Sequence, residues 1–79
     1  MIDKQAIREY LTTLVDRDVR IEDDASLLAT RLLDSLKVAG LVVFLETRYN
    51  VAFDGDELTP DNLDTISAIA GLLERKGVG

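Results

Sequence analysis

Apolar residues recur every three or four positions in three separate stretches of this 79-residue chain, and this spacing constrains its fold more than any other feature. Residues at this spacing share one face of a helix, whereas a half-buried strand requires strict alternation. The pattern therefore predicts three amphipathic helices that pack their apolar faces together. The three stripes are Ile7, Tyr10, Leu11 and Leu14; Val38, Leu41, Val42, Leu45 and Tyr49; and Ile66, Ile69, Ala70 and Leu73.

Residues with helix-capping side chains indicate where these helices begin and end. Asp3 and Asp34 precede the first two helices and are expected to accept hydrogen bonds from the free N–H groups of the first turn. The first helix is expected to end near Asp16. The last is expected to stop at Gly77, because glycine adopts the left-handed conformation with little strain.

Two further segments connect the helices. Residues 16–33 lose the helical periodicity, and we expect a long loop there whose aliphatic side chains hold it to the core. Thr59 and Pro60 are a capping residue and a first-turn proline, which predicts a short helical turn as far as Leu63. We therefore expect a single all-α domain over residues 1–79: a small four-helix bundle with a long first loop and a short third helix.

The second helix has a second apolar stripe. Leu36, Ala39 and Val43 repeat at helical spacing, and a helix of so small a domain seldom buries two faces, so this stripe is expected to be loosely covered or to bind a partner. Phe44 also lies outside the buried stripe and is a candidate contact for a partner or cargo. Gly40 weakens a helix by up to about 1 kcal/mol relative to alanine, and it is explained equally well by the close approach of a partner or by sequence drift.

Composition excludes most chemistry that the chain could perform alone. It contains no cysteine and no histidine, which removes thiolate nucleophiles, imidazole bases and the common zinc sites. Asp54 and Asp56 could open a calcium loop, but Thr59 stands where the turn glycine is needed. We therefore expect no enzyme, no catalytic residue and no metal site.

Charge and hydropathy indicate the kind of partner and location. With 15 acidic and 9 basic residues the chain carries a net charge of −6, so it repels nucleic acid and anionic membranes, and basic protein surfaces are its complement. Its longest apolar stretch is far shorter than the roughly 20 residues that cross a bilayer, and the charged N-terminal segment does not resemble a signal peptide. We expect a cytoplasmic monomer.

The tripeptide Asp34-Ser35-Leu36 lies at the start of the second helix, after the long loop. A serine hydroxyl is a weak nucleophile until a base removes its proton, and the chain has no histidine, while Lys37 points to another side of the helix. Ser35 is therefore expected to be a substrate that another enzyme modifies, and the helix N-terminus would favour a phosphodiester on its oxygen. Taken alone, such a tripeptide is more often a simple helix cap.

In its wider context the chain resembles the acyl carrier protein family over nearly its whole length. The resemblance implies a free-standing carrier whose Ser35 bears a phosphopantetheine arm, transferred from coenzyme A by a Mg²⁺-dependent phosphopantetheinyl transferase. The thiol of that arm would hold acyl intermediates of fatty-acid, polyketide or specialised acyl biosynthesis as thioesters. The matching segments are Ser26-Leu27-Leu28, Leu33-Asp34-Ser35-Leu36, Leu41-Val42 through Leu45-Glu46 and Tyr49, and Leu58-Thr59-Pro60-Asp61-Asn62-Leu63-Asp64-Thr65-Ile66.

The resemblance also implies a docking surface. In the family the second helix contacts partner enzymes, which carries over here to Asp34, Leu36, Val43 and Glu46. The expected partners are the transferase and the enzymes that load and transfer acyl groups, all through basic docking surfaces.

Three positions depart from the family pattern. The family glycine two or three residues before the aspartate falls on Arg31 or Leu32, Gly40 stands where a glutamate is usual, and Lys37 stands where an acidic or small residue is common. The docking helix is therefore less acidic than in housekeeping fatty-acid carriers, which favours a specialised carrier with its own partners.

Two alternatives stay open. The arm on Ser35 could carry aminoacyl or peptidyl groups. Without an arm, the chain could be a helical protein-interaction module whose Leu36, Ala39 and Val43 stripe binds a target helix. An extension of the carrier hypothesis is that an acyl chain shelters between the second and last helices, beside the small residues Ala39, Gly40, Ala68, Ala70 and Gly71.

Overall fold

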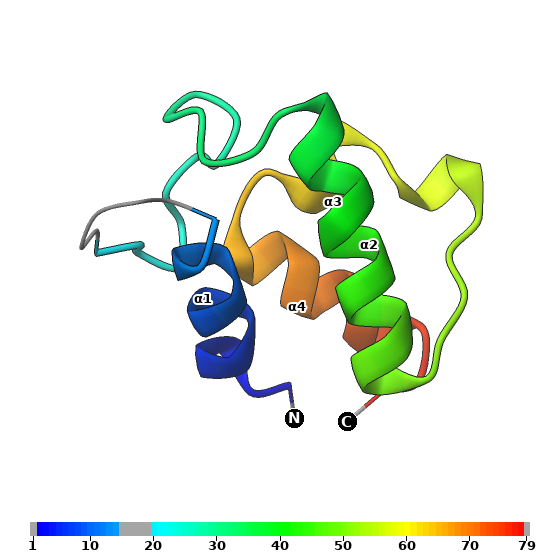
Figure 1. Cartoon of the computed structure of the whole chain (residues 1–79). Helices are drawn as coiled ribbons and strands as arrows, with labels where there is room; N and C mark the ends of the chain where they lie inside the picture. The colour runs from blue at the N-terminus through cyan, green and yellow to red at the C-terminus, as the bar shows by residue number, and fades with distance from the viewer. Residues whose placement is uncertain (1, 15–19, 79) are drawn as a thin grey trace.

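The computed structural model describes residues 2–14 and 20–78, and within these ranges the chain is helical with no strand. The predicted all-helical architecture with a short third helix is confirmed, and residues 20–33 of the predicted first loop contain no helix (Figure 1). None of the helices in these ranges is long and apolar enough to cross a membrane. The elements are α1 (Lys4–Thr12), α2 (Ser35–Tyr49), a 3₁₀ turn η1 (Gly55–Glu57), α3 (Pro60–Leu63) and α4 (Ile66–Arg75).

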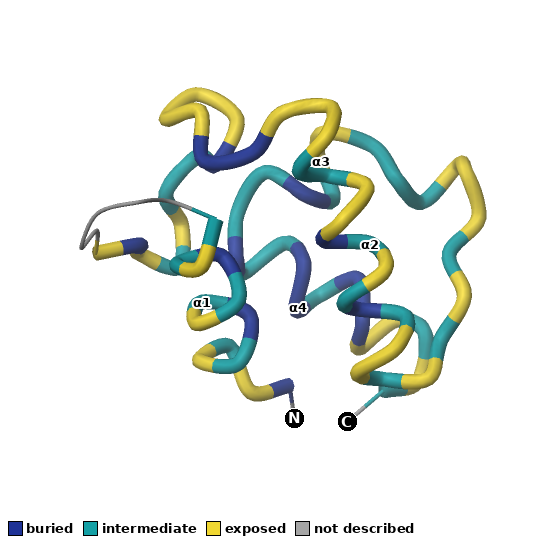
Figure 2. Tube along the Cα trace, in the orientation of Figure 1, coloured by how far each residue is buried: buried dark blue, intermediate teal, exposed yellow. Residues whose placement is uncertain are grey.

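Helix α4 lies at the centre of the bundle. It packs directly against α1 and α3, and in Figure 1 it lies between α1 and α2. Figure 2 shows that α1 and α2 bury the positions that face inward and expose their outer sides. Of the described residues, no polar or charged one is buried. The largest fully buried side chains are Ile7, Leu11, Leu27, Leu33, Leu41, Leu45, Ile66, Ile69, Leu72 and Leu73.

The helix ends confirm the predicted roles of Asp3 and Gly77 and correct the predicted end of α1. Asp3 caps α1 by accepting a hydrogen bond from the Gln5 N–H (3.0 Å), and Gly77 follows α4 with a φ of +89°. Helix α1 ends at Thr12, so the expected end near Asp16, which lies outside the described residues, is wrong. The hydroxyl of Thr13 donates to the Tyr10 carbonyl (2.6 Å), a local bond that competes with continuation of the helix.

The contact between α1 and α2 gives Phe44 and Gly40 internal roles. The ring of Phe44 stacks on Tyr10, with centroids 4.2 Å apart and planes 12° apart, so the partly buried Phe44 packs against α1. A Cβ on Gly40 would lie 3.0 Å from the Tyr10 hydroxyl oxygen. The close approach that explains this glycine is therefore provided by α1 of the same chain.

Candidate functional site

The loop that leads into α2 is held to the connection between α3 and α4. Ser26 Oγ and the Leu28 N–H both donate to Asp64 Oδ1, at 2.7 and 3.1 Å, and the Leu27 N–H donates to the Asp64 carbonyl (2.6 Å). The Leu33 N–H in turn donates to the Leu27 carbonyl (3.0 Å). These hydrogen bonds from residues 26–28 to Asp64, here called the loop clamp, fix the chain just before α2 begins.

The loop clamp also acts on the ionisation of Asp64. The hydrogen bond from the Ser26 hydroxyl, followed by those from the backbone N–H groups of Leu28 and Leu27, lowers the pKa of Asp64 below its ordinary value, against the smaller opposing effect of partial burial. The ionised carboxylate is therefore the form that stabilises the loop.

Arg31 has a backbone conformation that usually belongs to glycine. Its φ is +63°, in the left-handed region, and its N–H donates to the Leu28 carbonyl (3.2 Å) within a turn. Arg31 thus has a glycine-like backbone conformation, whereas the next residue, Leu32, is buried in the core. The turn accepts a strain of about 1 kcal/mol and presents an exposed guanidinium close in sequence to Ser35.

Asp34 caps α2 as predicted. Its Oδ1 accepts hydrogen bonds from the N–H groups of Leu36 (3.0 Å) and Lys37 (2.9 Å). Both N–H groups are therefore already bonded, and the expected stabilisation of a phosphodiester on Ser35 by the helix N-terminus is correspondingly weakened. The negative charge of Asp34 further opposes the favourable helix dipole.

Ser35 is the first residue of α2 and is exposed. Within residues 2–14 and 20–78, no hydrogen bond involves its hydroxyl. The start of α2 lies at the end of the bundle opposite to both chain termini (Figure 1). An external enzyme can therefore reach this hydroxyl, whereas the chain supplies no histidine that could activate it.

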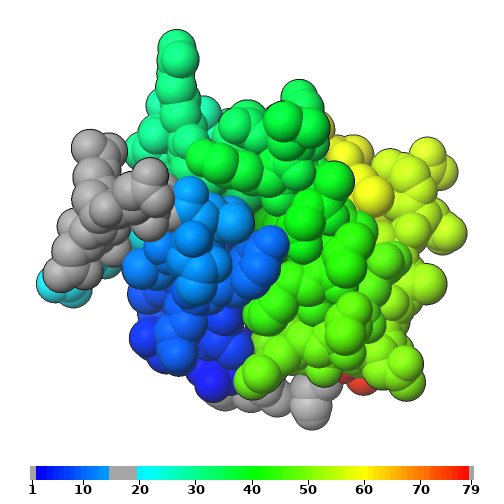
Figure 3. Space-filling model, in the orientation of Figure 1, coloured from blue at the N-terminus to red at the C-terminus, as the bar shows by residue number. Residues whose placement is uncertain are grey.

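The outer side of α2 carries an exposed, uncharged stripe, which Tyr10 of α1 approaches at Gly40. Leu36 is 87% exposed and Val43 is 61% exposed, which agrees with the prediction that the second apolar stripe is open. Figure 3 shows the surface of α2, in green, open to solvent beside α1. We call this surface the exposed α2 stripe, and it consists of Leu36, Ala39, Gly40, Val43 and Thr47.

Glu46, a predicted docking residue, has an internal partner. Its Oε2 accepts a hydrogen bond from the Phe53 N–H (3.0 Å), and the side chain is half-buried. Glu46 thus holds the segment after α2 against the helix. Among the predicted docking residues, Leu36 and Val43 face solvent, whereas the carboxylates of Asp34 and Glu46 are both engaged within the fold.

The small residues proposed to shelter an acyl chain do not line one interface. Ala39 and Gly40 are exposed on the outer side of α2, whereas Ala70 is buried in α4. A Cβ on Gly71 would contact Arg75 of the same helix, at 3.7 Å from Nη1. The sheltered route expected between α2 and α4 is therefore not formed by these residues.

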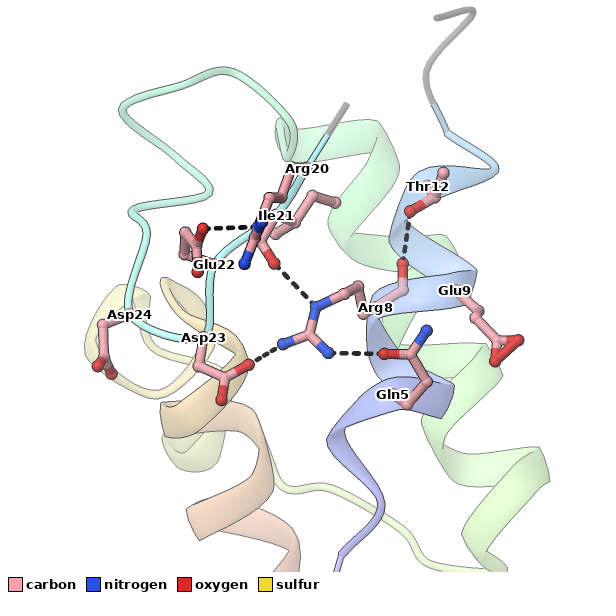
Figure 4. A pocket seen from close by; sticks show the side chains of 9 residues that line it. All are labelled: Gln5, Arg8, Glu9, Thr12, Arg20, Ile21, Glu22, Asp23 and Asp24. Carbon is pink, nitrogen blue, oxygen red and sulfur yellow. Dashed lines mark hydrogen bonds and ion pairs between the residues drawn. The ribbon is translucent and has the colours of Figure 1, made fainter. Parts of the chain in front are cut away.

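A polar depression between α1 and the first loop is organised around Arg8 (Figure 4). Arg8 Nε donates to the Ile21 carbonyl and Nη1 donates to Gln5 Oε1, both at 2.8 Å, and Nη2 pairs with Asp23. These partners use the guanidinium to attach the loop to α1. Sequence reasoning missed this role, because nothing in the local pattern around Arg8 indicates a partner more than ten positions away.

A second missed cluster lies at the end of α4. Lys76 Nζ pairs with the carboxylate of Glu57 (2.8 Å) and lies 5.4 Å from the centroid of the Phe53 ring. Hydrogen bonding from the Asp54 N–H, and then from Lys76, lowers the pKa of Glu57. These contacts close the segment between α2 and α3 onto the surface of α4.

Among the described residues, no base forms a hydrogen bond to the exposed hydroxyl of Ser35. In the part of the chain that the structure describes, no group of three or more histidine, cysteine, aspartate or glutamate residues is placed to hold a metal ion. In comparisons with known proteins, no protein-family model and no curated protein matches this chain.

Proposed function

We propose that this protein is a non-catalytic carrier of the acyl-carrier type, with a phosphopantetheine arm on Ser35. The observation that carries the proposal is the exposed hydroxyl of Ser35, without an internal hydrogen-bond partner among the described residues, at the start of a firmly capped helix. The sequence resemblance to acyl carrier proteins and the short α3 before α4 support it. The cargo is an acyl intermediate of fatty-acid, polyketide or specialised acyl biosynthesis in the cytoplasm.

In this function the chain acts as the acceptor of the arm. Ser35 Oγ forms a bond to the coenzyme A phosphorus that bears pantetheine, the pyrophosphate bond breaks, and 3′,5′-ADP leaves. The proton of Ser35 passes to a base of the phosphopantetheinyl transferase, which also supplies Mg²⁺. The attached thiol supplies the thioester chemistry that a chain without cysteine lacks.

The chain's own residues have positioning roles. Asp34 caps α2, so that Ser35 is held on an ordered first turn. The loop clamp holds the preceding segment, and the exposed α2 stripe offers apolar contact beside the attachment point.

Intact mass spectrometry tests the proposal directly. After coexpression with a broad-specificity phosphopantetheinyl transferase, we expect the wild-type chain to gain the mass of one arm and the Ser35→Ala variant to gain none. Thr47→Ala is the matched control, because it removes another exposed α2 hydroxyl and should leave the modification intact. A folded wild-type chain that stays unmodified contradicts the proposal.

The exposure of Leu36 favours a second candidate, a helical interaction module without an arm. In that case the exposed α2 stripe binds an amphipathic target helix and Ser35 is only a structural residue. An unmodified chain whose target binding is unchanged in Ser35→Ala and lost in Leu36→Ala would support this function over the carrier.

A further inference from the structure

Basic side chains that form no salt bridge are concentrated around α2. Arg31, Lys37 and Arg48 lie in the loop before α2 or on it, and none has a salt-bridge partner within residues 2–14 and 20–78. Arg75, at the end of α4, also has none but donates to the side chain of Asn62. The basic residues that do pair with acidic neighbours are Lys4, Arg8, Arg20 and Lys76.

The acidic side chains near α2 cancel only part of this charge. Residues 31–49 contain three basic residues and two acidic ones, Asp34 and Glu46, so this segment keeps one net positive charge. Residues 50–78, in contrast, contain six acidic and two basic residues. The acidity of the chain therefore lies away from the exposed α2 stripe.

The basic residues of α2 border the exposed α2 stripe on one flank. At 100° per residue, Lys37 and Arg48 fall on the side of the stripe that faces α1, about three turns apart. Arg48 lines a shallow depression together with Glu9, which offsets part of its charge. The Ser35 end of the stripe, beside Lys37 and near Arg31 in sequence, is therefore its more positive end.

From this arrangement we infer that the partner protein that docks beside Ser35 presents an apolar patch bordered by acidic side chains. Leu36 and Val43 contact the apolar patch, and Arg31 and Lys37 face its carboxylates. The inference deepens the proposed carrier function, on which its biological role rests. The net charge of the chain led us to expect a basic partner surface, whereas this inference predicts an acidic one. The local charge decides because charges at the rim of an interface act over about one Debye length, roughly 10 Å.

Two synthetic helical peptides with the same leucine face test this partner chemistry. One carries glutamate and the other lysine at every flanking position, and each is titrated into the isotope-labelled full chain at low salt. We expect the glutamate peptide to shift the amide resonances of Leu36, Ala39 and Val43. The lysine peptide is expected to shift the acidic segment 54–64 instead.

Charge variants make the test specific. Lys37→Glu and Arg31→Glu should each weaken binding of the glutamate peptide by about two- to fivefold at low salt, and less at high salt. Arg20→Glu makes the same change in net charge in the first loop, at an 87% exposed side chain, and should have a smaller effect.

The inference is overturned if the lysine peptide shifts the stripe as strongly as the glutamate peptide, if neither peptide shifts it, or if Lys37→Glu binds the glutamate peptide unchanged. Because the titration uses the chain without an arm, it is independent of the mass measurement on Ser35. A chain that gains the arm but prefers the lysine peptide loses only this inference. A chain that stays unmodified but prefers the glutamate peptide loses only the carrier function.

Discussion

The two long connections on either side of α2 are held in different ways. The one before α2, residues 20–34, inserts fully buried Leu27 and Leu33 into the core and is tied to Asp64 by uncharged donors. The one after α2, residues 50–59, contains no buried residue and is closed by the ion pair between Glu57 and Lys76. The segment that delivers Ser35 is thus anchored in the interior, whereas the other connection is held at the surface.

Truncating one apolar anchor in each connection should give the largest contrast. Leu27→Ala removes a fully buried side chain and should lower the free energy of unfolding by about 2 to 5 kcal/mol. Phe53→Ala removes a half-buried ring and should cost less. Urea denaturation of the two variants measures the difference, and equal losses would mean that the two connections are anchored alike.

Acid should have a smaller effect on stability, through the two carboxylates that hold the connections, Asp64 in the loop clamp and Glu57 in the ion pair with Lys76. The pKa values of Asp64 and Glu57 are both lowered from ordinary values of 3.8 and 4.5. A lowered carboxyl pKa gives stability that is fully present above the ordinary value and is lost as pH falls through the lowered one. We expect thermal stability to fall below about pH 5, and less steeply in Asp64→Asn, whose amide oxygen still accepts from Ser26 and Leu28.

High salt at neutral pH should distinguish the Glu57–Lys76 ion pair from the loop clamp at Asp64. It should weaken the Glu57–Lys76 ion pair and leave the bonds from neutral donors to Asp64 almost unchanged. Glu57→Gln should therefore reduce the salt dependence of the melting temperature, while Asp64→Asn should not. If Asp64→Asn reduced the salt dependence of the melting temperature and Glu57→Gln did not, the loop clamp and not the surface ion pair would be the interaction that salt screens.

The smallest expected effect concerns backbone strain. Each connection contains one non-glycine residue with positive φ, Arg31 at +63° and Asn50 at +54°. Asparagine tolerates this region better than arginine, so Arg31→Gly should stabilise the fold by up to about 1 kcal/mol and Asn50→Gly should change it less. Chemical denaturation of both variants checks this, and a destabilised Arg31→Gly would show that the arginine side chain contributes more than its backbone costs.

The sequence predicted the features that depend on neighbouring residues. Asp3, Asp34 and Gly77 act within one helical turn, and their roles could be inferred from spacing alone. The end of α1 was misplaced, because the Thr13 hydroxyl offers a local alternative to the next helical bond that periodicity does not reveal.

Contacts between segments that lie far apart in the sequence could not be predicted from local spacing. The bond from Ser26 to Asp64 spans 38 positions, and no local pattern indicates it. At the candidate site, the exposure of Ser35 and Leu36 followed from helical spacing. The engagement of Glu46 by the Phe53 N–H did not, because it depends on how the chain turns back after α2.

The cap on α2 has a consequence for whatever is attached beside it. Because the Asp34 carboxylate already takes the N–H groups of Leu36 and Lys37, a phosphate on Ser35 finds neither of these donors free and keeps its hydration. If Ser35 carries the proposed arm, that arm starts without a hydrogen bond to either of these two N–H groups. A partner enzyme could then bind the arm without first breaking the bonds of the Asp34 cap.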